Sequence, residues 1–144
     1  MTCCFFGHKD TPHSIRGQLE KTLIDLIENK GVDCFLVGNQ GSFDAMAQGI
    51  LKELKLRYPE ICYSVVLAYV PGTRKGCGTA EPDHTLLPEG IELVPPRFAI
   101  TWRNKWMVRA SDVVVAYVAH DWGGAAQFVA YARRQNKQVV NLAE

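Results

Sequence analysis

Five short apolar runs alternate along the chain with segments in which apolar residues recur every three or four positions. The runs cover residues 2–6, 33–37, 62–70, 112–118 and 138–142. Their apolar character is nearly continuous, which is typical of strands that are buried on both faces of a parallel sheet. The sequence therefore predicts about five parallel strands.

The segments between the runs predict helices, each with an apolar stripe on one face. The stripes are formed by Ile15, Leu19, Leu23, Leu26 and Ile27; by Phe43, Met46, Ala47, Ile50, Leu51 and Leu54; by Phe98, Trp102 and Trp106; and by Ala125, Phe128, Val129 and Ala132. Thr11-Pro12 suits the start of the first helix and Gly31 its end. Ser42 suits the cap of the second helix.

Alternating strands and helices imply right-handed crossovers and a doubly wound sheet. The expected fold is a Rossmann-like three-layer α/β/α sandwich with a mostly parallel sheet in the strand order 3-2-1-4-5. Residues 1–144 then form a single domain, and 47% hydrophobic residues suit a core of that size. Residues 71–96 interrupt the alternation with prolines, glycines and a short strand-like stretch at 91–94, so we expect a long loop or lid there.

The charge balance narrows the classes of partner. The net charge is +1 and 22% of the residues are charged. Bulk electrostatics therefore gives no case for binding nucleic acid or an anionic membrane, although a local basic patch stays open. No apolar stretch approaches the roughly 20 residues of a membrane span, and the N-terminus lacks the layout of a signal peptide. We expect a cytoplasmic protein that binds no membrane.

The five cysteines are odd in number and show no C-x-x-C spacing. Cys3, Cys4, Cys34 and Cys62 lie in or beside apolar runs, where cysteine usually packs as a small hydrophobic residue. Reduced, structural thiols are therefore expected, rather than a disulfide framework or a zinc site. The four histidines are scattered along the chain, so neither a metal site nor a cofactor is predicted.

Glycine-bearing turns follow three of the apolar runs, and each of them precedes a helical pattern. The turns are Gly7-His8-Lys9, Gly38-Asn39-Gln40-Gly41-Ser42 and His120-Asp121-Trp122-Gly123-Gly124. Glycine lets a ligand approach the backbone, and the free N–H groups at a helix N-terminus favour an anion. Since ligands of open α/β sheets lie beyond the carboxyl ends of the strands, the turns predict one pocket for a phosphate-bearing or nucleotide-like ligand. The G-x-G-x-x-G pattern is absent, which disfavours a nicotinamide oxidoreductase.

The candidate ligand-binding residues follow strand ends or lie early in the helices. They are Gly7, His8, Lys9, Gly38, Asn39, Gly41, Ser42, Asp44, Tyr69, Pro71, Arg103, Asn104, His120, Trp122, Gly123 and Gly124. Asp44 could bind ribose hydroxyls or act on the sugar, or it could only complement the helix dipole. His8 could serve as a phosphate ligand or general acid, or be held by the loop backbone. Lys9 could donate to a phosphate or lie in solvent, and His120 and Asp121 could touch the ligand or merely cap a helix.

Arg103 and Asn104 lie early in the third predicted helix, where their side chains could reach back over the pocket. Arginine gives bidentate phosphate recognition and asparagine can read a base edge. The alternative is a solvated arginine and a surface asparagine. Trp102 and Trp106 are expected in a core or interface, and Ser42 is expected to cap a helix rather than act as a nucleophile.

Several of these motifs together resemble the SLOG superfamily, named for the SMF/DprA and LOG proteins, and within it the small bacterial YpsA-like branch. The resemblance rests on Phe6-Gly7-His8-Lys9, residues 38–47, residues 103–108, Ser111-Asp112, and Trp122-Gly123-Gly124 followed by Tyr131-Ala132. It spans nearly the whole chain apart from residues 71–96. It implies a Rossmann-like fold that binds nucleotides or nucleotide-derived ligands. Because related proteins often pair through helices, it also allows a homo-oligomer.

The enzymatic branch of that superfamily, the LOG-type phosphoribohydrolases, cleaves the N-glycosidic bond of a nucleoside monophosphate. Its motif P-G-G-x-G-T-x-x-E carries a glutamate that handles the ribose and the developing oxocarbenium charge. When Gly123-Gly124 is aligned with that double glycine, Ala126, Gln127 and Ala130 stand in place of the next glycine, the threonine and the glutamate. Alanine can neither take a proton nor stabilise a cation, so an enzyme of this kind would need a carboxylate from elsewhere.

Two functions are compatible with the family resemblance and the glycine-bearing turns. The first is a sensor or ligand-binding domain for a nucleotide or nucleotide-derived small molecule, which needs no glutamate. The alternative is a nucleotide N-glycosidase that uses Asp44 or His8 as catalytic residues. Binding of single-stranded DNA, as by DprA-like proteins, would need a basic groove with stacking aromatic residues, and the near-neutral charge argues against it.

Overall fold

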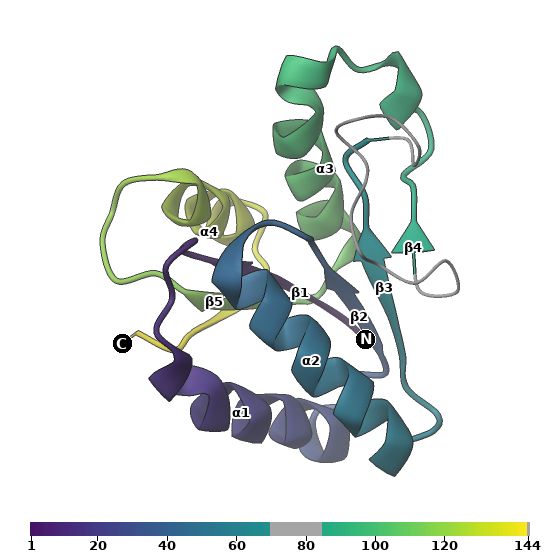
Figure 1. Ribbon diagram of the computed structural model, residues 1–144, viewed down its shortest axis with the longest axis vertical. Helices are drawn as coiled ribbons and strands as arrows, with labels where there is room; N and C mark the ends of the chain where they lie inside the picture. The colour runs from purple at the N-terminus through teal and green to yellow at the C-terminus, as the bar shows by residue number, and fades with distance from the viewer. Residues whose placement is uncertain (70–84, 144) are drawn as a thin grey trace.

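The computed structural model describes residues 1–69 and 85–143, and they build an α/β fold around one parallel sheet (Figure 1). The six strands of the sheet have the order β4-β3-β2-β1-β5-β6. Every pairing is parallel. The strands are β1 (Thr2–Gly7), β2 (Cys34–Val37), β3 (Cys62–Val66), β4 (Thr85–Leu86), β5 (Val113–Tyr117) and β6 (Gln138–Asn141). The fold class and the order of the five expected strands are confirmed, and β4 adds a two-residue edge strand.

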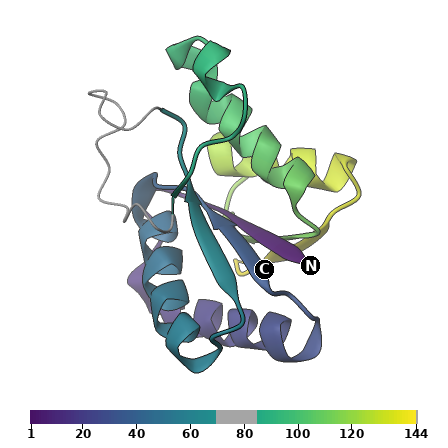
Figure 2. The same ribbon diagram turned by 90° about the vertical axis from the view of Figure 1, so that its right-hand side faces the viewer.

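Helices cover both faces of the sheet (Figure 2). The helices α1 (Arg16–Asn29) and α2 (Gly41–Arg57) lie on one face, and α3 (Pro96–Ala110) and α4 (Gly124–Arg134) lie on the other. In the sheet, β1 lies between β2 and β5. The connecting helices change from one face of the sheet to the other between β1 and β5. This arrangement is the doubly wound topology, and it creates a switch point at the carboxyl ends of β1 and β5.

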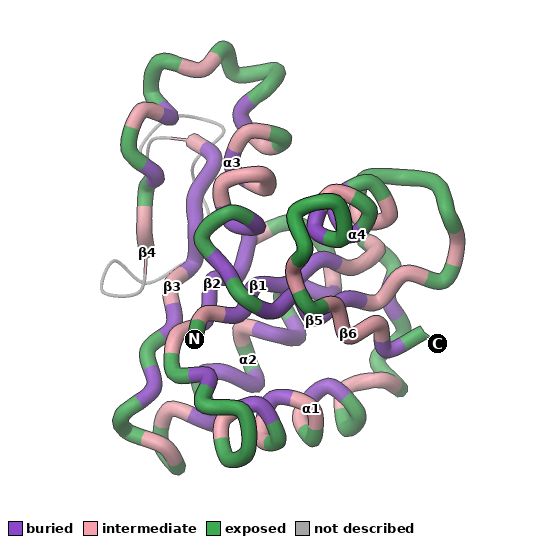
Figure 3. The backbone as a smooth tube through the Cα atoms, turned by 180° about the vertical axis from the view of Figure 1, so that it is seen from behind, coloured by how far each residue is buried: buried purple, intermediate pink, exposed green. Residues whose placement is uncertain are grey.

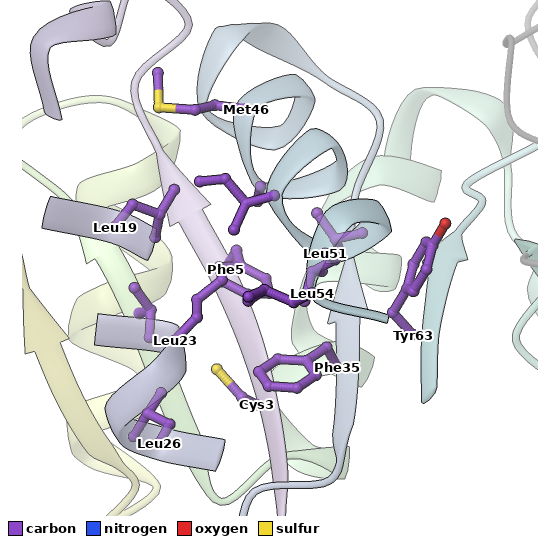
Figure 4. Close-up of a cluster of buried hydrophobic side chains, with 14 of the residues drawn as sticks. Cys3, Phe5, Leu19, Leu23, Leu26, Phe35, Met46, Leu51, Leu54 and Tyr63 are labelled. Atoms are coloured by element: carbon purple, nitrogen blue, oxygen red, sulfur yellow. The ribbon is translucent and has the colours of Figure 1, made fainter. Parts of the chain in front are cut away.

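The core divides into two clusters because successive strand residues point to opposite faces of the sheet. In β1, Cys3 and Phe5 pack toward α1 and α2, whereas Cys4 and Phe6 pack toward α3 and α4. The larger cluster is shown in Figure 4, where leucines of α1 and α2 surround Phe5. The ring centroids of Phe5 and Phe35 lie 6.2 Å apart. Both faces of the strands are apolar, which explains the continuous runs in the sequence.

Several element boundaries differ from those expected. Residues 91–94 are strand-like in sequence, but Ile91–Leu93 forms the 3-10 turn η3, which follows Gly90 in a left-handed conformation. The helix α1 begins at Arg16, after the 3-10 turn η1 (His13–Ile15), rather than at Pro12. It ends before Gly31, whose φ of 75° stops the helix as expected. The strand β3 ends at Val66, so it is shorter than the apolar run that predicted it.

Helix α3 buries a different face from the one expected. Phe98 is 51% exposed and Trp102 is half-buried, whereas the half-buried Trp106 packs against the core as expected. The buried positions are instead Ala99, Arg103, Met107 and Val108. Ala99, Arg103 and Met107 recur every four residues, and the guanidinium of Arg103 finds polar partners at the end of the sheet. The aromatic period therefore predicted the packing of Trp106 but not the fully buried face, because an arginine occupies the centre of that face.

The cysteines are free thiols in the part of the chain that the structure describes. Cys3 and Cys4 are buried, as expected, but Cys34 is half-buried and Cys62 is exposed. The expectation of buried packing is therefore wrong for Cys62, which begins β3 where β4 does not pair with that strand. Cys77 lies outside the described residues. No helix within residues 1–69 and 85–143 has both the length and the apolar character needed to span a membrane.

Candidate ligand-binding cavity

A cavity of about 610 Å³ lies at the carboxyl end of β1, between the turns that follow β1, β2 and β5. Helices α3 and α4 form its other wall through Ile100, Met107 and Phe128. The chain between β5 and α4, which closes one side, is largely exposed, while the strands beneath it are buried (Figure 3). This volume lies within the range of ligand-binding pockets, and the position is the one that open α/β sheets use for ligands.

Most of the candidate residues line this cavity. They are Gly7, His8, Lys9, Gly38, Asp44, Arg103, Asn104, His120, Trp122, Gly123 and Gly124. Asn39, Gly41, Ser42 and Tyr69 are not among its lining residues, and Pro71 lies outside the described residues. The lining residues that the sequence did not single out are Phe5, Phe6, Asp10, Gln40, Ile100, Met107, Ala125 and Phe128. Apart from Asp10 and Gln40, they are apolar or aromatic, and the sequence placed Phe5, Phe6, Ala125 and Phe128 in apolar runs or stripes rather than in a site.

Gly7 and Gly38, in the first two turns, lack a side chain where other side chains of the protein fill the space. A Cβ atom on Gly7 would lie 2.2 Å from Cγ of Phe43, which fills that space. A Cβ atom on Gly38 would lie 2.8 Å from Oδ2 of Asp44 and 3.3 Å from a guanidinium nitrogen of Arg103. These two glycines are therefore explained by internal packing, without any need for a ligand.

The N-terminus of α2 is already supplied with acceptors. The backbone N–H of Gln40 donates to Oδ2 of Asp44 at 3.0 Å, and the N–H of Ser42 donates to the carbonyl of Lys9 at 3.0 Å. Gln40, not Ser42, is the cap residue of α2, and the Ser42 hydroxyl instead donates to the carbonyl of Thr11. The expectation that Ser42 caps this helix is therefore wrong. Because two of these N–H groups are occupied and the carboxylate of Asp44 lies in the first turn, the end of α2 is a poorer anion site than a free helix start.

The N-terminus of α4 is more open. Gly123 precedes the helix with a φ of 95°, and no side chain caps this end among the described residues. A Cβ atom on Gly124 would meet nothing within 4 Å. The first N–H groups of an α-helix lack partners within the helix and favour negative charge. Of the helix starts at the cavity, α4 is therefore the better place for a phosphate.

Three aromatic rings stack in a column beside this helix start. The ring of His8, at the end of β1, lies 3.9 Å from that of His120 with an interplanar angle of 18°. The ring of His120 lies 3.7 Å from that of Trp122 at 12°. Trp122 is 68% exposed, so the outer end of the column faces solvent. The sequence did not predict the column, because β1 and β5 bring its members together across more than a hundred residues.

His8 is held by the backbone and lines the cavity at the same time. Its Nε2 accepts a hydrogen bond from the N–H of Ala119 at 3.0 Å. Burial, and to a smaller degree the proximity of His120, lowers the pKa of His8 below its usual value. His120 is held through Nδ1, which lies 2.8 Å from the carbonyl oxygen of Trp122. Neither histidine caps α4, whose cap residue is Gly123.

Asp44 and Arg103 are both buried at the inner end of the cavity, close enough for their charges to interact. Asp44 is 8% exposed and Arg103 is 1% exposed. Burial raises the pKa of Asp44 to about 6, although the N–H of Gln40 and the charge of Arg103 oppose the rise. Burial lowers the pKa of Arg103, and the charge of Asp44 opposes that shift. A carboxylate with a pKa near neutrality can change its protonation state in the range where many enzymes work.

The guanidinium of Arg103 is engaged by protein groups. One of its terminal nitrogens donates to the carbonyl of Val66 at 2.7 Å and to Oδ1 of Asn39 at 3.3 Å. Its Nε donates to Oδ1 of Asn104 at 2.8 Å. Arg103 is therefore not a solvated surface residue. Its contacts fix α3 and the turn after β2 relative to the end of β3.

The described residues contain no cluster of three or more histidine, cysteine, aspartate or glutamate side chains that could hold a metal ion. Ala130, which the motif alignment set opposite the missing glutamate, is exposed on α4 and does not line the cavity. Comparison of the chain with profiles of known protein families and with curated proteins gives no match.

Proposed function

We propose that the cavity binds a nucleotide or nucleotide-derived small molecule and that the protein acts as a sensor or ligand-binding domain. The observation that carries the proposal is the joint presence, in one cavity, of an uncapped helix start, a column of stacked rings and an apolar wall. A phosphate suits the first, and a heteroaromatic base suits the other two. The resemblance to the SLOG superfamily supports the same ligand class.

In this proposal the phosphate binds the first N–H groups of α4, with Lys9 at the exposed rim of the cavity as a second donor. The base packs against the ring column and the side chains of Met107 and Phe128. The carboxylate of Asp44 accepts hydrogen bonds from ribose hydroxyls at the inner end. Arg103 stabilises the charge of Asp44 rather than binding the phosphate, because its Nε and one of its terminal nitrogens donate to protein groups.

Thermal-shift measurements with the nucleoside monophosphates, the matching nucleosides and inorganic phosphate test this proposal. At least one monophosphate should raise the Tm more than its nucleoside, since the phosphate adds contacts at α4. The variant Trp122→Ala should bind that monophosphate roughly tenfold more weakly or worse, because stacking on an aromatic side chain contributes about 1–3 kcal/mol.

The matched control is Leu56→Ala, which removes another exposed apolar side chain, 83% exposed on α2 and outside the cavity lining. It should leave the response unchanged. If no nucleotide raises the Tm of the folded protein, the proposal is wrong.

Asp44 supports a second candidate function, hydrolysis of the N-glycosidic bond of a nucleotide. Its carboxyl group is buried in the cavity and its pKa is raised to about 6. A group of this kind can stabilise an oxocarbenium-like charge as a carboxylate or deliver a proton as an acid. His8, the other residue proposed to be catalytic, lines the same cavity.

Incubation with nucleoside monophosphates and chromatographic detection of free base separates the two functions. Hydrolysis predicts release of base that Asp44→Asn abolishes while ligand-induced thermal shifts remain. A bound monophosphate that stays intact indicates the binding function alone.

A further inference from the structure

Cys34 and Cys62 lie directly opposite one another at the starts of two neighbouring strands. They are register partners of β2 and β3 in a parallel pairing, so their side chains project from the same face of the sheet. Neighbouring strands are separated by about 4.8 Å, and a disulfide accepts Cα separations of about 4.4–6.8 Å. The two residues are therefore positioned for a bond without a rearrangement of the sheet.

The surroundings of the two thiols differ in a way that suits sequential reaction. Cys62 is exposed, whereas Cys34 is half-buried between Cys62 and Thr2, its register partner in β1. Burial and interaction with the Cys62 sulfur raise the pKa of Cys34 to about 11, and the nearby Asp33 adds to the rise. The accessible sulfur is thus that of Cys62, and the less exposed Cys34 beside it is a protonated thiol.

We propose that Cys34 and Cys62 form a reversible disulfide by exchange with a low-molecular-weight disulfide. The Cys62 thiolate attacks one sulfur of the reagent RSSR, forming a mixed disulfide and releasing RS⁻. The sulfur of Cys34 loses its proton and attacks the sulfur of Cys62, which releases the second RS⁻. Two protein thiols are oxidised, one RSSR is reduced to two RSH, and the bond staples β2 to β3.

This site is independent of the nucleotide cavity. Cys34 and Cys62 begin their strands, so they lie at the amino-terminal edge of the sheet, whereas the cavity lies beyond the carboxyl ends. The product closes a loop between β2 and β3 and should raise the Tm by several degrees, because a cross-link restricts the unfolded chain. Failure of this inference would leave the proposed function untouched, and the converse also holds.

The test uses full-length protein carrying Cys77→Ser, so that only Cys3, Cys4, Cys34 and Cys62 remain. The folded protein is incubated with oxidised glutathione, quenched with acid, and digested without reduction for mass spectrometry. The expected product is a peptide pair linked through Cys34 and Cys62, with no glutathione retained and with the original Tm restored by dithiothreitol. In the additional variant Cys34→Ser, the reaction should stop with glutathione attached to Cys62.

Three results on the Cys77→Ser protein would overturn the proposal. Glutathione that persists on Cys62 while Cys34 stays free would show that the second step does not occur. Chains joined to one another through Cys62 would show that the exposed thiol reacts between molecules instead. Four unreacted thiols after prolonged incubation would show that Cys62 is inert.

Discussion

Asp44 is a carboxylate whose position favours its protonated form. It is 8% exposed, burial raises its pKa to about 6, and the charge of Arg103 opposes this rise only in part. Ionising Asp44 inside the fold costs free energy, and ribose hydroxyls could donate to its carboxylate the hydrogen bonds that water would otherwise supply. Asp44 therefore affects both the stability of the fold and the proposed binding of a ribose.

The stability of the protein should depend on pH through Asp44. Its folded-state pKa lies above the unfolded value of 3.8, so the folded protein binds more protons than the unfolded chain between the two values. Its contribution to stability is therefore greatest at low pH and falls as the pH rises toward 6. Relative to wild type, the free energy of unfolding of Asp44→Asn should increase by up to about 3 kcal/mol between about pH 4 and about pH 7.

Urea unfolding of both proteins at the two pH values measures this difference. Asp121→Asn, which removes an exposed carboxylate from the loop beside the cavity, serves as the control. A difference between wild type and Asp44→Asn that does not change with pH would contradict the assigned pKa shift.

Gly7 should be far less tolerant of a methyl group than a glycine in open space. In Gly7→Ala the new Cβ atom would be forced against the ring of Phe43, and such overpacking typically costs about 1–3 kcal/mol or more. Gly49→Ala is the matched variant, because nothing lies within 4 Å of its Cβ position in the interior of α2. It should stabilise the protein by about 0.5–1 kcal/mol. Equal effects of the two changes on denaturant unfolding would refute the packing explanation of Gly7.

At the scale of elements, the sequence predicted the strands well because the physical signal is local. Phe5 and Phe6 point to opposite faces of β1, and both side chains are apolar. A continuous apolar run of this kind indicates a central parallel strand. The orientation of α3 could not be predicted in this way. Its buried face contains Arg103, and the partners that make this burial tolerable come from Val66 and Asn39, remote in sequence.

The cavity, too, could be predicted only in part from the sequence. Glycine and polar residues at strand ends marked its location, because parallel strands end at one edge of the sheet. The contact of Gly7 with Phe43, the closure of the α2 start by Asp44, and the stacking of His8 on His120 each depend on tertiary packing. Only the structure could therefore distinguish the open start of α4 from the occupied start of α2.

Arg103 should hold α3 against the end of the sheet. Arg103→Met keeps the length and apolar volume of the side chain but leaves Asp44 buried without its cation and the carbonyl of Val66 without its side-chain donor. We expect a loss of more than about 2 kcal/mol in the free energy of unfolding. Arg97→Met, on the exposed first turn of the same helix, should change it by less than about 0.5 kcal/mol. Similar unfolding midpoints for the two variants would show that Arg103 has no structural role.

At the scale of the whole molecule, the two edges of the sheet carry different chemistry. The carboxyl edge holds the cavity with its ring column and the open start of α4, and the amino edge holds the paired thiols of Cys34 and Cys62. Between them lie the buried, mostly apolar residues of β1, β2 and β5. The proposed ligand binding at one edge and the proposed thiol exchange at the other can therefore be measured separately in the same protein.

The most direct test of the central proposal is amide NMR of the wild-type protein titrated with a nucleoside monophosphate. Saturable shifts should be largest at Gly123, Gly124 and Ala125, where we propose that the phosphate binds, and at His8. The amide signals of Cys34 and Cys62, at the opposite edge, should not shift. Absence of shifts with every nucleoside monophosphate, or saturable shifts confined to residues outside the cavity, would show that the cavity does not bind these ligands.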